Sequence, residues 1–468
     1  MLDDITAMSS QEKYNTLRQT YPTFVYESYQ YDVQPDGLHI VFSFRLDNAV
    51  CFHPSTFIPS RPFLLFNHPR EVLDNLVFHV GMIELVSYWK CACPPVVEVH
   101  CGSLDDTQIQ FWTKLYWHGL GEFFYVNGIH NAIDDFMSLT STGSPSLHIA
   151  SPASGPSSNN YIVPIGGGKD SVVTLELLSE LKGTSLRPLI MNPRGATIGC
   201  IQAAGYSLDD VIVIHRTIDP LLLELNARKT SHGESVFLNG HTPFSAMLAF
   251  YTLLSAQLSG IPNIALSNES SANESTVLNS DVNHQYSKSL EFENDFRAYV
   301  ASYIPSYNYF SFLRPLSELQ IAMLFGRYEQ YFDVFRSCNV GSKRDIWCCH
   351  CAKCLFAYII LSPFIPPQRL NAIFGANLLD DLSLQLEFNQ LVGMEATKPF
   401  ECVGTVSEVR SALSMTLARW YADGNPPALL KGFPLQPPTT PLHTLLPDHN
   451  LPPQVFDILL SHVQRVTA

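Results

Sequence analysis

The sequence lacks a long run of apolar residues. Its richest apolar stretch, residues 355–364, contains a serine and is followed by prolines, so it falls short of the roughly eighteen residues of a membrane span. Residues 1–5 are acidic and lack the basic and apolar regions of a secretory signal peptide. We therefore expect a cytoplasmic protein that has no membrane partner.

Basic residues are also few. The chain has 28 Lys and Arg against 43 Asp and Glu, a formal net charge of -15. Nucleic-acid binding gains most of its affinity from cations that release counterions from phosphates, so this balance argues against a nucleic-acid partner. A small anionic ligand in one local site remains compatible. With 468 residues, 46% of them hydrophobic, the chain is expected to be globular, with roughly two to four domains.

The eleven cysteines do not form a disulfide pattern, since their number is odd and five of them lie within residues 338–354. Four of them have the spacing C-x9-C-x2-C-x2-C, at Cys338, Cys348, Cys351 and Cys354. Four thiolates at this spacing can complete the tetrahedral shell of a structural zinc ion, which we favour. A set of ordinary buried cysteines is the alternative. A redox site is less favoured, because no C-x2-C pair opens a thioredoxin-like helix.

The first part of the chain predicts a sheet and then a loop. Over residues 24–46, apolar and polar residues alternate around a Pro-Asp-Gly turn, which predicts a β-hairpin. We expect an N-terminal α+β domain over residues 1–140. Its aromatic stretch, 111–128, is expected either to bind part of a substrate or only to pack. Residues 141–160, rich in Ser, Pro, Gly and Asn, predict a linker or a long loop.

From residue 161 the pattern changes to apolar strands that alternate with helices. We predict strands at 161–165, 187–191, 211–214 and 264–266. This alternation predicts an α/β fold with a doubly wound parallel sheet. In such sheets the ligand lies outside the carboxyl ends of the strands.

The first of these strands runs into a glycine-rich turn that is typical of a nucleotide phosphate site. The residues of the turn are Gly166, Gly167, Gly168, Lys169, Asp170 and Ser171. Glycines let backbone amides approach an anion, and the helix that follows adds its positive end. The Ser171 hydroxyl suits a phosphate oxygen, the Lys169 ammonium the leaving charge, and the Asp170 carboxylate Mg²⁺. A merely tight turn is the alternative.

The spacing of this turn differs from the Walker A and dinucleotide motifs and resembles the PP-loop, with Gly166 where that family usually has serine. The resemblance implies a PP-loop (adenine nucleotide alpha hydrolase-like) fold that splits ATP between its α and β phosphates. We therefore expect a PP-loop ATP-binding catalytic domain over residues 161–365, including the cysteine cluster, and a helical C-terminal region over 366–468. Asn192, after the second strand, is a further candidate for cofactor binding.

Polar clusters follow the fourth predicted strand. Residues 267–274 carry two carboxylates and two amides, and residues 283–288 add an imidazole, a phenol and an ammonium. Such groups can hold Mg²⁺ or transfer a proton, although a solvated polar loop is the alternative for each cluster. The candidates are Glu269, Asn273, Glu274, His284 and Lys288. Arg314, before a proline, is either a bidentate clamp for carboxylate or phosphate or a surface ion pair.

Taken together, several segments resemble the MurL-type UDP-N-acetylmuramoyl-L-alanyl-L-glutamate epimerases of bacterial peptidoglycan synthesis. These segments are 111–128, 163–171, 238–246, 267–274, 283–288, 313–320 and the cysteine array with Lys353. The resemblance extends over most of residues 24–365. The proline-rich last hundred residues diverge most, so the resemblance assigns no function there.

The resemblance implies an ATP- and Mg²⁺-dependent inversion of the terminal L-glutamate of UDP-MurNAc-L-Ala-L-Glu, with release of AMP and diphosphate. An α-proton beside a free carboxylate is very weakly acidic, and adenylation makes it removable because it cancels the carboxylate charge. Asp170 is then expected to support adenylation, and Glu269, Glu274 and His284 are candidates for the acid and base. The candidates for holding the substrate are Lys288, Arg314 and Asn273.

Three other functions are alternatives to this one. A PP-loop synthetase of the 7-cyano-7-deazaguanine type also combines this loop with a cysteine zinc site, although its chains are shorter and lack such an N-terminal domain. A PP-loop tRNA-modifying enzyme is disfavoured by the net charge of -15. From a different class, a non-catalytic ATP-binding sensor remains possible, but Asp170, Ser171 and the cluster at 267–274 argue against it.

Overall fold

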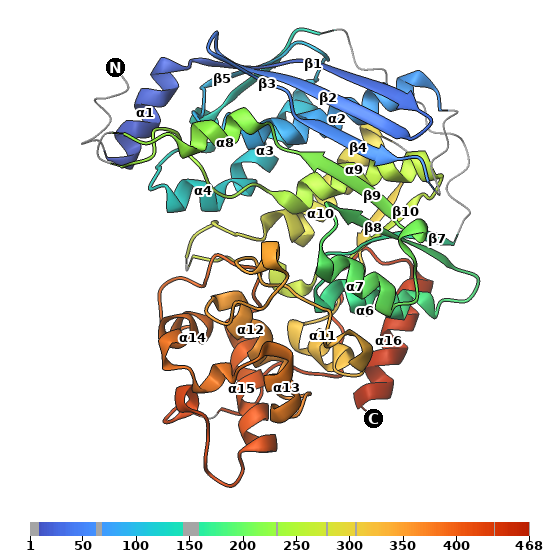
Figure 1. Ribbon diagram of the computed structural model, residues 1–468, viewed down its shortest axis with the longest axis vertical. Helices are drawn as coiled ribbons and strands as arrows, with labels where there is room; N and C mark the ends of the chain where they lie inside the picture. The colour runs from blue at the N-terminus through green and yellow to red at the C-terminus, as the bar shows by residue number, and fades with distance from the viewer. Residues whose placement is uncertain are drawn as a thin grey trace.

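The computed structural model describes residues 9–61, 68–143, 159–230, 233–277, 279–304, 307–434 and 436–467. Its strands are β1 (Thr23–Gln34), β2 (Gly37–Leu46), β3 (Val50–Phe52), β4 (Ser55–Pro59), β5 (Val96–Val99), β6 (Ser138–Ser141), β7 (Asn160–Pro164), β8 (Ser185–Met191), β9 (Ile212–Thr217), β10 (Asn263–Leu266) and β11 (Asn308–Ser311). They form one sheet in the order β11-β10-β7-β8-β9-β4-β2-β1-β5-β6, with β3 paired to β2 (Figure 1). The α/β class predicted from the sequence is therefore confirmed.

The N-terminal half of the sheet contains the predicted hairpin. β1 and β2 are antiparallel, and their pairing ends with Gln34 opposite Gly37, so the turn lies where the alternation placed it. β5 and β6 extend this half as strands parallel to β1. On the other side, β4 pairs antiparallel with β2.

The other half of the sheet, β11-β10-β7-β8-β9, is parallel throughout. The chain moves from β7 outward to β8 and β9, and then returns to the other side of β7 for β10 and β11. This is a doubly wound order, and it places the topological switch point between β7 and β10. Four of these five strands were predicted. β11 was missed, because a strand of four residues gives too short a pattern to be recognised.

The two halves join where β4 pairs antiparallel with β9, with Phe57 opposite His215. Beside this junction, Arg216 makes a bidentate contact with the buried Glu84 carboxylate, from Nε to Oε1 at 2.5 Å and from Nη2 to Oε2 at 2.7 Å. The Tyr251 hydroxyl also donates to Glu84, at 2.9 Å. The strands expected in an N-terminal domain and those expected in a catalytic domain thus belong to one continuous sheet.

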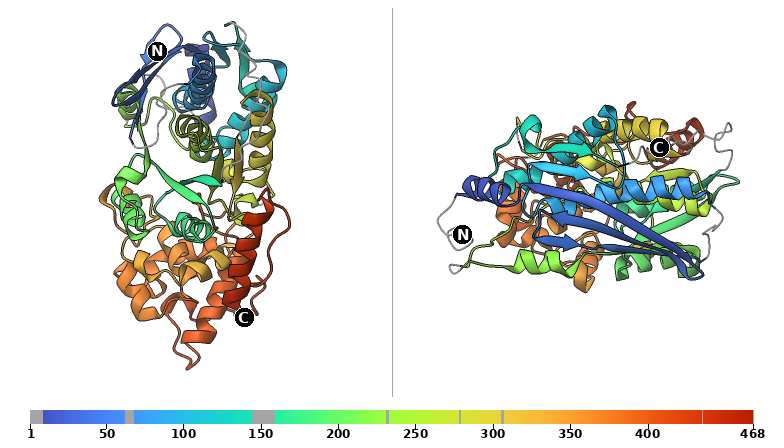
Figure 2. Two further views of the ribbon diagram at one scale, coloured as in Figure 1. Left: turned by 90° about the vertical axis from the view of Figure 1, so that its right-hand side faces the viewer. Right: turned by 90° about the horizontal axis from the view of Figure 1, so that it is seen from above.

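Helices cover both faces of the sheet, and the region after residue 366 is helical, as expected. The helices are α1 (Ser10–Thr20), α2 (Arg70–Trp89), α3 (Asp106–Gly119), α4 (Gly121–Val126), α5 (Ile133–Phe136), α6 (Lys169–Ser179), α7 (Gly195–Ala203), α8 (Pro220–Ala227), α9 (Phe244–Ser259), α10 (Leu290–Tyr303), α11 (Glu318–Phe325), α12 (Ala352–Leu361), α13 (Pro367–Phe374), α14 (Gln385–Leu391), α15 (Val406–Trp420) and α16 (Pro453–Thr467). The last helix, α16, packs against α6 and α11 (Figure 2).

Alternation along the parallel strands divides the apolar interior into two cores. Ile162 of β7 lies in one core with residues of α2, α9 and α10, and its neighbour Val163 lies in the other with residues of α6, α11 and α12. Successive side chains of a strand point to opposite faces of the sheet, so a strand that is apolar at nearly every position contributes to a core on each face. The C-terminal helices α15 and α16 add residues to the second core, which fixes them beneath the parallel sheet.

Most of the predicted linker, 141–160, lies outside the described residues. In the parts of the chain that are described, none of the helices combines the length and the apolar composition that crossing a membrane requires.

Candidate functional site

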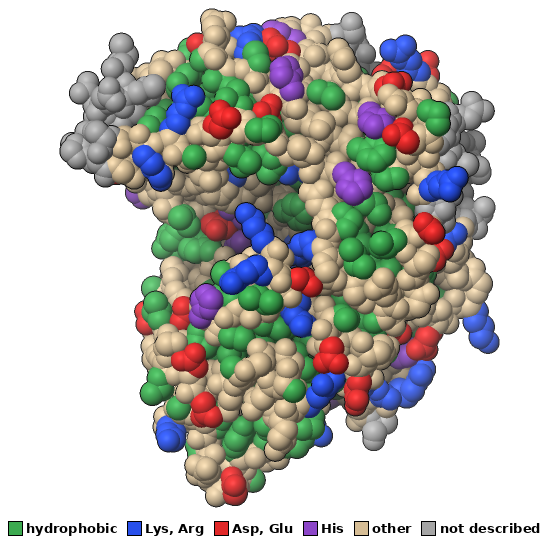
Figure 3. Space-filling model, viewed as in Figure 1, with side chains coloured by type: hydrophobic (Ala, Val, Ile, Leu, Met, Phe, Trp, Pro, Cys, Tyr) green, Lys and Arg blue, Asp and Glu red, His purple; other side chains and the backbone are tan. Residues whose placement is uncertain are grey.

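The loops that follow β7 and β10 lie on either side of the switch point, where doubly wound sheets bind their ligands. The first loop is the glycine-rich turn at 166–171, and the second contains the polar cluster at 267–274. The fold therefore brings two of the predicted clusters to one edge of the sheet. The space-filling view shows a hollow between the N-terminal strands and the C-terminal helices, with Lys and Arg side chains gathered along it (Figure 3).

The glycine turn presents backbone amides at the start of α6. Gly167 has a φ of +83°, and a Cβ there would lie 3.0 Å from the backbone of Ala196, so the position requires glycine. At Gly166 a Cβ would meet no atom within 4 Å. Within the described part of the chain, the amides of Gly166, Gly167 and Gly168 donate to no protein acceptor. Such unpaired amides beside a helix N-terminus suit an anion.

The Lys169 ammonium lies between two carboxylates. It donates to Asp170 Oδ1 at 2.5 Å and to Glu318 Oε2, and only 6% of the residue is exposed. Burial disfavours its charge, but Asp170 and Glu318 outweigh burial and raise the pKa of Lys169. Lys169 is thus a fixed, buried cation.

Glu318 is the first residue of α11, and its amide donates to Glu408 Oε1 at 2.7 Å. Its side chain is buried. Burial raises the pKa of Glu318, and although Lys169 opposes this effect, the charges of Asp170 and Glu269 reinforce it, so the pKa reaches about 8. The site therefore holds a carboxyl group that can carry a proton near neutral pH.

Asp170 behaves in the opposite way. Burial favours its neutral form, but Lys169, Lys353 and Lys288 outweigh burial and lower the pKa of Asp170. It is therefore a carboxylate at neutral pH, with part of its side chain open to solvent. Among the residues of the glycine turn, it has the charge and the exposure that a Mg²⁺ ligand needs.

Arg314 connects the two polar clusters from the protein interior. Its Nη1 donates to the Glu269 carbonyl at 2.6 Å, and its Nη2 donates to the Lys288 carbonyl and, at 3.2 Å, to Glu293 Oε2. Only 1% of Arg314 is exposed, and its Nε has no partner among the described residues. Both terminal nitrogens thus fix the loops of the site, and the alternative of a surface ion pair is wrong.

The remaining candidates of the 267–274 cluster differ in their surroundings. Glu269 is buried at 3% exposure. Glu274 is open to solvent and pairs with Lys398. Asn273 uses its Oδ1 to accept the amide of Leu290, at 2.8 Å, which ties the loop to the start of α10. Glu269 alone of these three is buried, and its charge acts on Lys288 and Glu318.

Asn192 joins the carboxyl ends of β8 and β9. It has a φ of +51°, a conformation that asparagine tolerates better than most residues. Its Nδ2 donates to the Arg216 carbonyl at 3.0 Å, and its Oδ1 accepts the Arg216 amide at 2.8 Å. The side chain is thus engaged in shaping the edge of the sheet, and its role in cofactor binding stays a prediction.

His284 lies within a second cluster, at the other end of the site. Its Nδ1 contacts Glu122 Oε2, and the same oxygen lies 3.1 Å from Nδ1 of His241. Its Nε2 lies 3.8 Å from the Cys402 sulfur. Burial, and then the charge of His284, lower the pKa of His241 to about 4, so His241 is neutral. Four segments that are far apart in the sequence therefore meet at one imidazole.

Lys288 and Lys353 connect this second cluster with the glycine turn. Burial disfavours the charge of Lys288, but Cys402, Glu269 and Asp170 outweigh burial and raise its pKa. The Lys353 ammonium donates to the Cys402 carbonyl and also acts on Asp170. Two cations thus lie between the Asp170 carboxylate and the Cys402 thiol.

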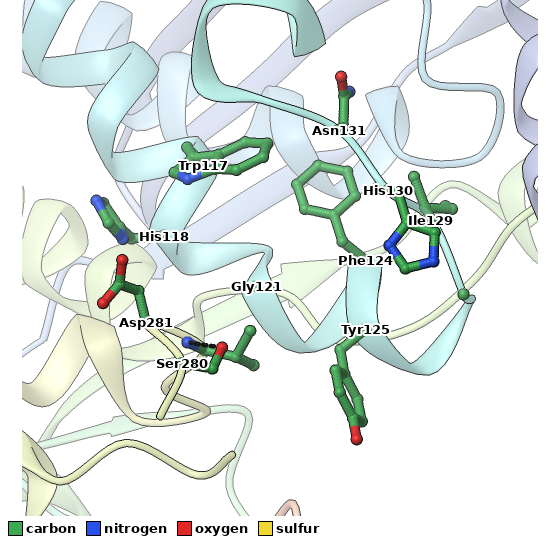
Figure 4. Close-up of a pocket in the computed structure, with 12 residues that line it drawn as sticks. Trp117, His118, Gly121, Phe124, Tyr125, Ile129, His130, Asn131, Ser280 and Asp281 are labelled. Carbon is green, nitrogen blue, oxygen red and sulfur yellow. Dashed lines mark hydrogen bonds between the residues drawn. The ribbon is translucent and has the colours of Figure 1, made fainter. Parts of the chain in front are cut away.

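A pocket of about 460 Å³ opens beside α4, next to this cluster. Its walls include the aromatic side chains of Trp117, Phe124 and Tyr125, and His118 and Asp281 lie next to each other on one side of it (Figure 4). Some aromatic side chains of the stretch 111–128 therefore line this pocket. Other members, such as Trp112, are fully buried, as the packing alternative predicted.

The four predicted zinc ligands converge. The sulfurs of Cys338 and Cys351 are 3.9 Å apart and those of Cys348 and Cys354 are 3.7 Å apart, and all four lie within 4.8 Å of one another. A zinc–sulfur bond of about 2.3 Å in a tetrahedron places sulfurs about 3.8 Å apart. The donor set and its spacing thus fit a zinc ion, and the helix α12 begins within the array.

Sequence reasoning missed several residues of the site. Glu122, His241 and Glu318 lie in segments that carried the family resemblance, but nothing in their local pattern distinguished them from capping or surface residues. Cys402 and Glu408 lie in the last hundred residues, to which no function was assigned. Nothing in the local sequence identifies these two residues, because each reaches the site only through the packing of the C-terminal helices.

The sequence matches two family models, described as the MurL N-terminal domain over residues 15–312 and the MurL C-terminal domain over residues 334–426. The likeness therefore extends further toward the C-terminus than the motifs indicated. A relative from Xanthomonas oryzae pv. oryzae is 32% identical, over 93% of this chain and 96% of its own. Relatives from a Micromonospora species and from Salinispora tropica are 35% and 34% identical, over 73% of this chain and 75% and 73% of their own.

All three relatives carry the name UDP-N-acetyl-alpha-D-muramoyl-L-alanyl-L-glutamate epimerase. The two family models together span the parallel sheet, both clusters of the site and the cysteine array. The resemblance inferred from the motifs is thus confirmed, and the chain belongs to the MurL family.

Proposed function

We propose that this protein inverts the terminal L-glutamate of UDP-MurNAc-L-Ala-L-Glu to the D form, in an ATP- and Mg²⁺-dependent reaction that releases AMP and diphosphate. The observation that carries the proposal is the glycine turn at the switch point, with unpaired amides next to the Asp170 carboxylate and the Lys169 ammonium. The names of the relatives supply the substrate and the stereochemical outcome.

The chemistry of the substrate explains why a nucleotide site belongs in an epimerase. Removal of the α-proton beside a free carboxylate would place two negative charges on one group. When bound, the nucleotide supplies an AMP group that turns the carboxylate into an acyl-adenylate, which has lost that charge. The protein then has to bind both reactants, hold them together and move one proton at the α-carbon.

The residues of the glycine turn fit the nucleotide. The amides of Gly166, Gly167 and Gly168 would hold phosphate oxygens, and the Ser171 hydroxyl, which donates to the Gly168 carbonyl at 3.1 Å, would have to turn to join them. The Asp170 carboxylate would hold Mg²⁺, since three lysines keep its pKa low. Lys169 cannot reach far, because Glu318 holds it, so it would act as a fixed positive charge beneath the phosphates.

The pocket beside α4 suits the part of the substrate that does not react. Trp117, Phe124 and Tyr125 offer aromatic faces of the kind on which a base or sugar ring packs. It lies next to Glu122 and His284, whereas the glycine turn lies beyond Lys288. A long substrate such as a nucleotide-linked dipeptide would therefore span from this pocket toward the phosphates, with its reacting end between the two clusters.

The cysteine array fits a structural zinc ion, with Cys338, Cys348, Cys351 and Cys354 as ligands. The array leads directly into α12, so the ion would fix the start of the helix that carries Lys353. Its role would be to position that cation.

Membership of the MurL family argues against a synthetase of the 7-cyano-7-deazaguanine type, and the match over both halves of the chain argues against a simple ATP sensor. The decisive experiment incubates the purified protein with UDP-MurNAc-L-Ala-L-Glu, ATP and Mg²⁺, followed by hydrolysis and chiral analysis of the glutamate. We expect D-glutamate together with AMP and diphosphate. Diphosphate release without D-glutamate, or D-glutamate without ATP consumption, would each contradict the proposal.

A further inference from the structure

Cys402 lies at the end of a row of side chains that resembles an activated-thiol site. The Glu122 carboxylate contacts His284 Nδ1, and His284 Nε2 lies 3.8 Å from the Cys402 sulfur. A carboxylate that orients an imidazole, which in turn contacts a thiol, is the arrangement that enzymes use to keep cysteine reactive. The three residues come from α4, from the loop before α10 and from the loop before α15.

The surroundings of the thiol favour its ionised form. Burial disfavours the thiolate, but Lys288, His284 and Lys353 outweigh burial and lower the pKa of Cys402 to about 6. Burial likewise disfavours the charged imidazole, but Cys402 and Glu122 outweigh it and raise the pKa of His284 to about 9. Between these values the pair is a thiolate next to an imidazolium. The neighbouring His241 stays neutral and does not compete for the proton.

The position of the thiolate links it to the reacting end of the substrate. Lys353 fixes the backbone of Cys402 by donating to its carbonyl, and Lys288 acts on both Cys402 and Asp170. On the other side, the pocket beside α4 is lined by Gly121 and Val282, which lie one residue from Glu122 and two residues from His284 in the sequence. The sulfur therefore lies between the expected adenylation centre and the expected binding site for the rest of the substrate.

His284 itself is poorly suited to accept a proton. Both of its ring nitrogens are engaged, one with Glu122 and one with Cys402, and its raised pKa keeps both of them protonated at neutral pH. Glu274 is also unsuited, because it lies at the surface and pairs with Lys398. Glu122 contacts both imidazoles through its Oε2, so Cys402 is the anionic group of this cluster that lies next to Lys288 and Lys353.

We propose that the Cys402 thiolate is the base that removes the α-proton of the activated glutamyl residue, with His284 and Glu122 as positioning residues. In this step the α-carbon–hydrogen bond breaks, the proton moves to the sulfur, and the electron pair moves to the acyl carbonyl oxygen as an enolate. A proton that originates from water then adds to the opposite face of the α-carbon. Water cleaves the acyl-adenylate to the D-glutamyl carboxylate and AMP, and the thiol returns its proton to solvent. The inference rests on the proposed adenylation, and the experiment separates the two.

The test compares Cys402→Ala and Cys402→Ser with the wild type and with Cys51→Ala, whose thiol is exposed on β3. Substrate-dependent exchange of labelled diphosphate into ATP reports adenylation, and deuterium uptake at the glutamate α-carbon in D₂O reports proton removal. We expect both Cys402 variants to keep diphosphate exchange, and to lose α-exchange and epimerisation by a factor on the order of 10² to 10⁴. Cys51→Ala should match the wild type.

Other outcomes would overturn the inference. A folded Cys402→Ser protein that takes up deuterium at the wild-type rate excludes the thiolate as the base. An acyl group bound to Cys402, seen as a mass increase after acid quenching, would make the cysteine a nucleophile instead. If the wild type itself shows no diphosphate exchange, the proposed adenylation fails, which is a different result. Circular dichroism establishes folding for each variant.

Glu122→Gln tests the positioning role. The substitution removes the charge that helps to hold His284 protonated, and the imidazolium favours the Cys402 thiolate, so the acid limb of the α-exchange rate should move to higher pH while diphosphate exchange is kept. A variant whose α-exchange falls equally at every pH would show that Glu122 only supports the fold. If the pH profile of α-exchange does not move in the variant, then Glu122 does not act on a charged His284.

Discussion

Lys169 and Glu318 are each the first residue of a helix, and their side chains meet in the protein interior. Lys169 opens α6 directly after the glycine turn, and Glu318 opens α11 directly after β11 and the loop that contains Arg314. The pair therefore connects the edge of the sheet that carries the glycine turn to the C-terminal helices, which pack on α11. With Asp170 also in contact with Lys169, one ammonium compensates two carboxyl groups.

Glu318→Gln should make the stability of the protein less dependent on pH. The folded state raises the pKa of Glu318 from 4.5 to about 8, so the stability that this group contributes is complete below its ordinary value and is lost as the pH rises through about 8. Glutamine imitates the protonated form at every pH. We expect the Tm of the wild type to fall relative to that of the variant across this interval, measured by differential scanning fluorimetry.

The matched control is Glu224→Gln on the exposed surface of α8. Its Tm difference from the wild type should stay constant over the same interval. A constant difference for Glu318→Gln as well would show that Lys169 keeps Glu318 ionised.

Gly167→Ala and Gly166→Ala should differ, although the two residues are neighbours. Gly167 has a left-handed φ and a Cβ would press on the backbone of Ala196 at 3.0 Å, whereas a Cβ at Gly166 meets open space. We expect Gly167→Ala to lower stability by about 1 kcal/mol or more and to weaken ATP binding at least tenfold. Gly166→Ala should keep wild-type stability. Urea unfolding and nucleotide titration measure both, and equal effects would contradict the backbone argument.

The sequence predicted those elements whose apolar pattern is long enough and lies within one segment of the chain. The hairpin and four of the parallel strands were predicted, because their apolar patterns are local and long enough to be read. β11 was not predicted. The union of both halves through β4 and β9 was not predicted either, because pairing between distant strands leaves no periodic signal in either segment.

The site shows the same limit. The glycine turn and the cysteine array have a spacing that dictates their geometry, and the four sulfurs do converge. Cys402 shows the opposite case. It is an isolated cysteine in a divergent segment, and only its contacts with His284 and Lys288, more than a hundred residues away in the sequence, mark it as a site residue. Arg314 was noticed, but its burial could not be read from its neighbours in the sequence.

Cys351→Ser should remove one zinc ligand and loosen the start of α12. A structural zinc site contributes directly to folding stability, so we expect lower zinc content, measured by inductively coupled plasma mass spectrometry, and a lower Tm. Cys51→Ser, at an exposed position on β3, should change neither. Wild-type protein that contains no zinc after metal-free purification, yet keeps its Tm, would refute the zinc site.

Arg314→Met should mainly destabilise the fold. The substitution leaves the buried Glu293 carboxylate without its cation and frees the carbonyls of Glu269 and Lys288. Removing one partner of a buried ion pair costs about 3–5 kcal/mol, which urea unfolding would detect. Arg465→Met, at an exposed position on α16, is the control and should have little effect. A stable Arg314→Met protein with a raised KM would instead support the substrate clamp that the sequence suggested.

Alkylation by iodoacetamide should reveal the state of Cys402 without any substrate. Only the thiolate reacts, and Lys288, His284 and Lys353, against the effect of burial, lower the pKa of Cys402 from 9.0 to about 6. The labelling rate at Cys402, followed by peptide mass spectrometry, should therefore rise through about pH 6 and level off near neutral pH. Lys288→Met removes the largest of the favourable charges, so its labelling curve should move to higher pH. The exposed Cys51 provides the internal reference, because its labelling should not respond to Lys288→Met. A Cys402 curve that rises only near pH 9 would mean that the three cations do not stabilise the thiolate, and proton removal by Cys402 would then lose its physical basis.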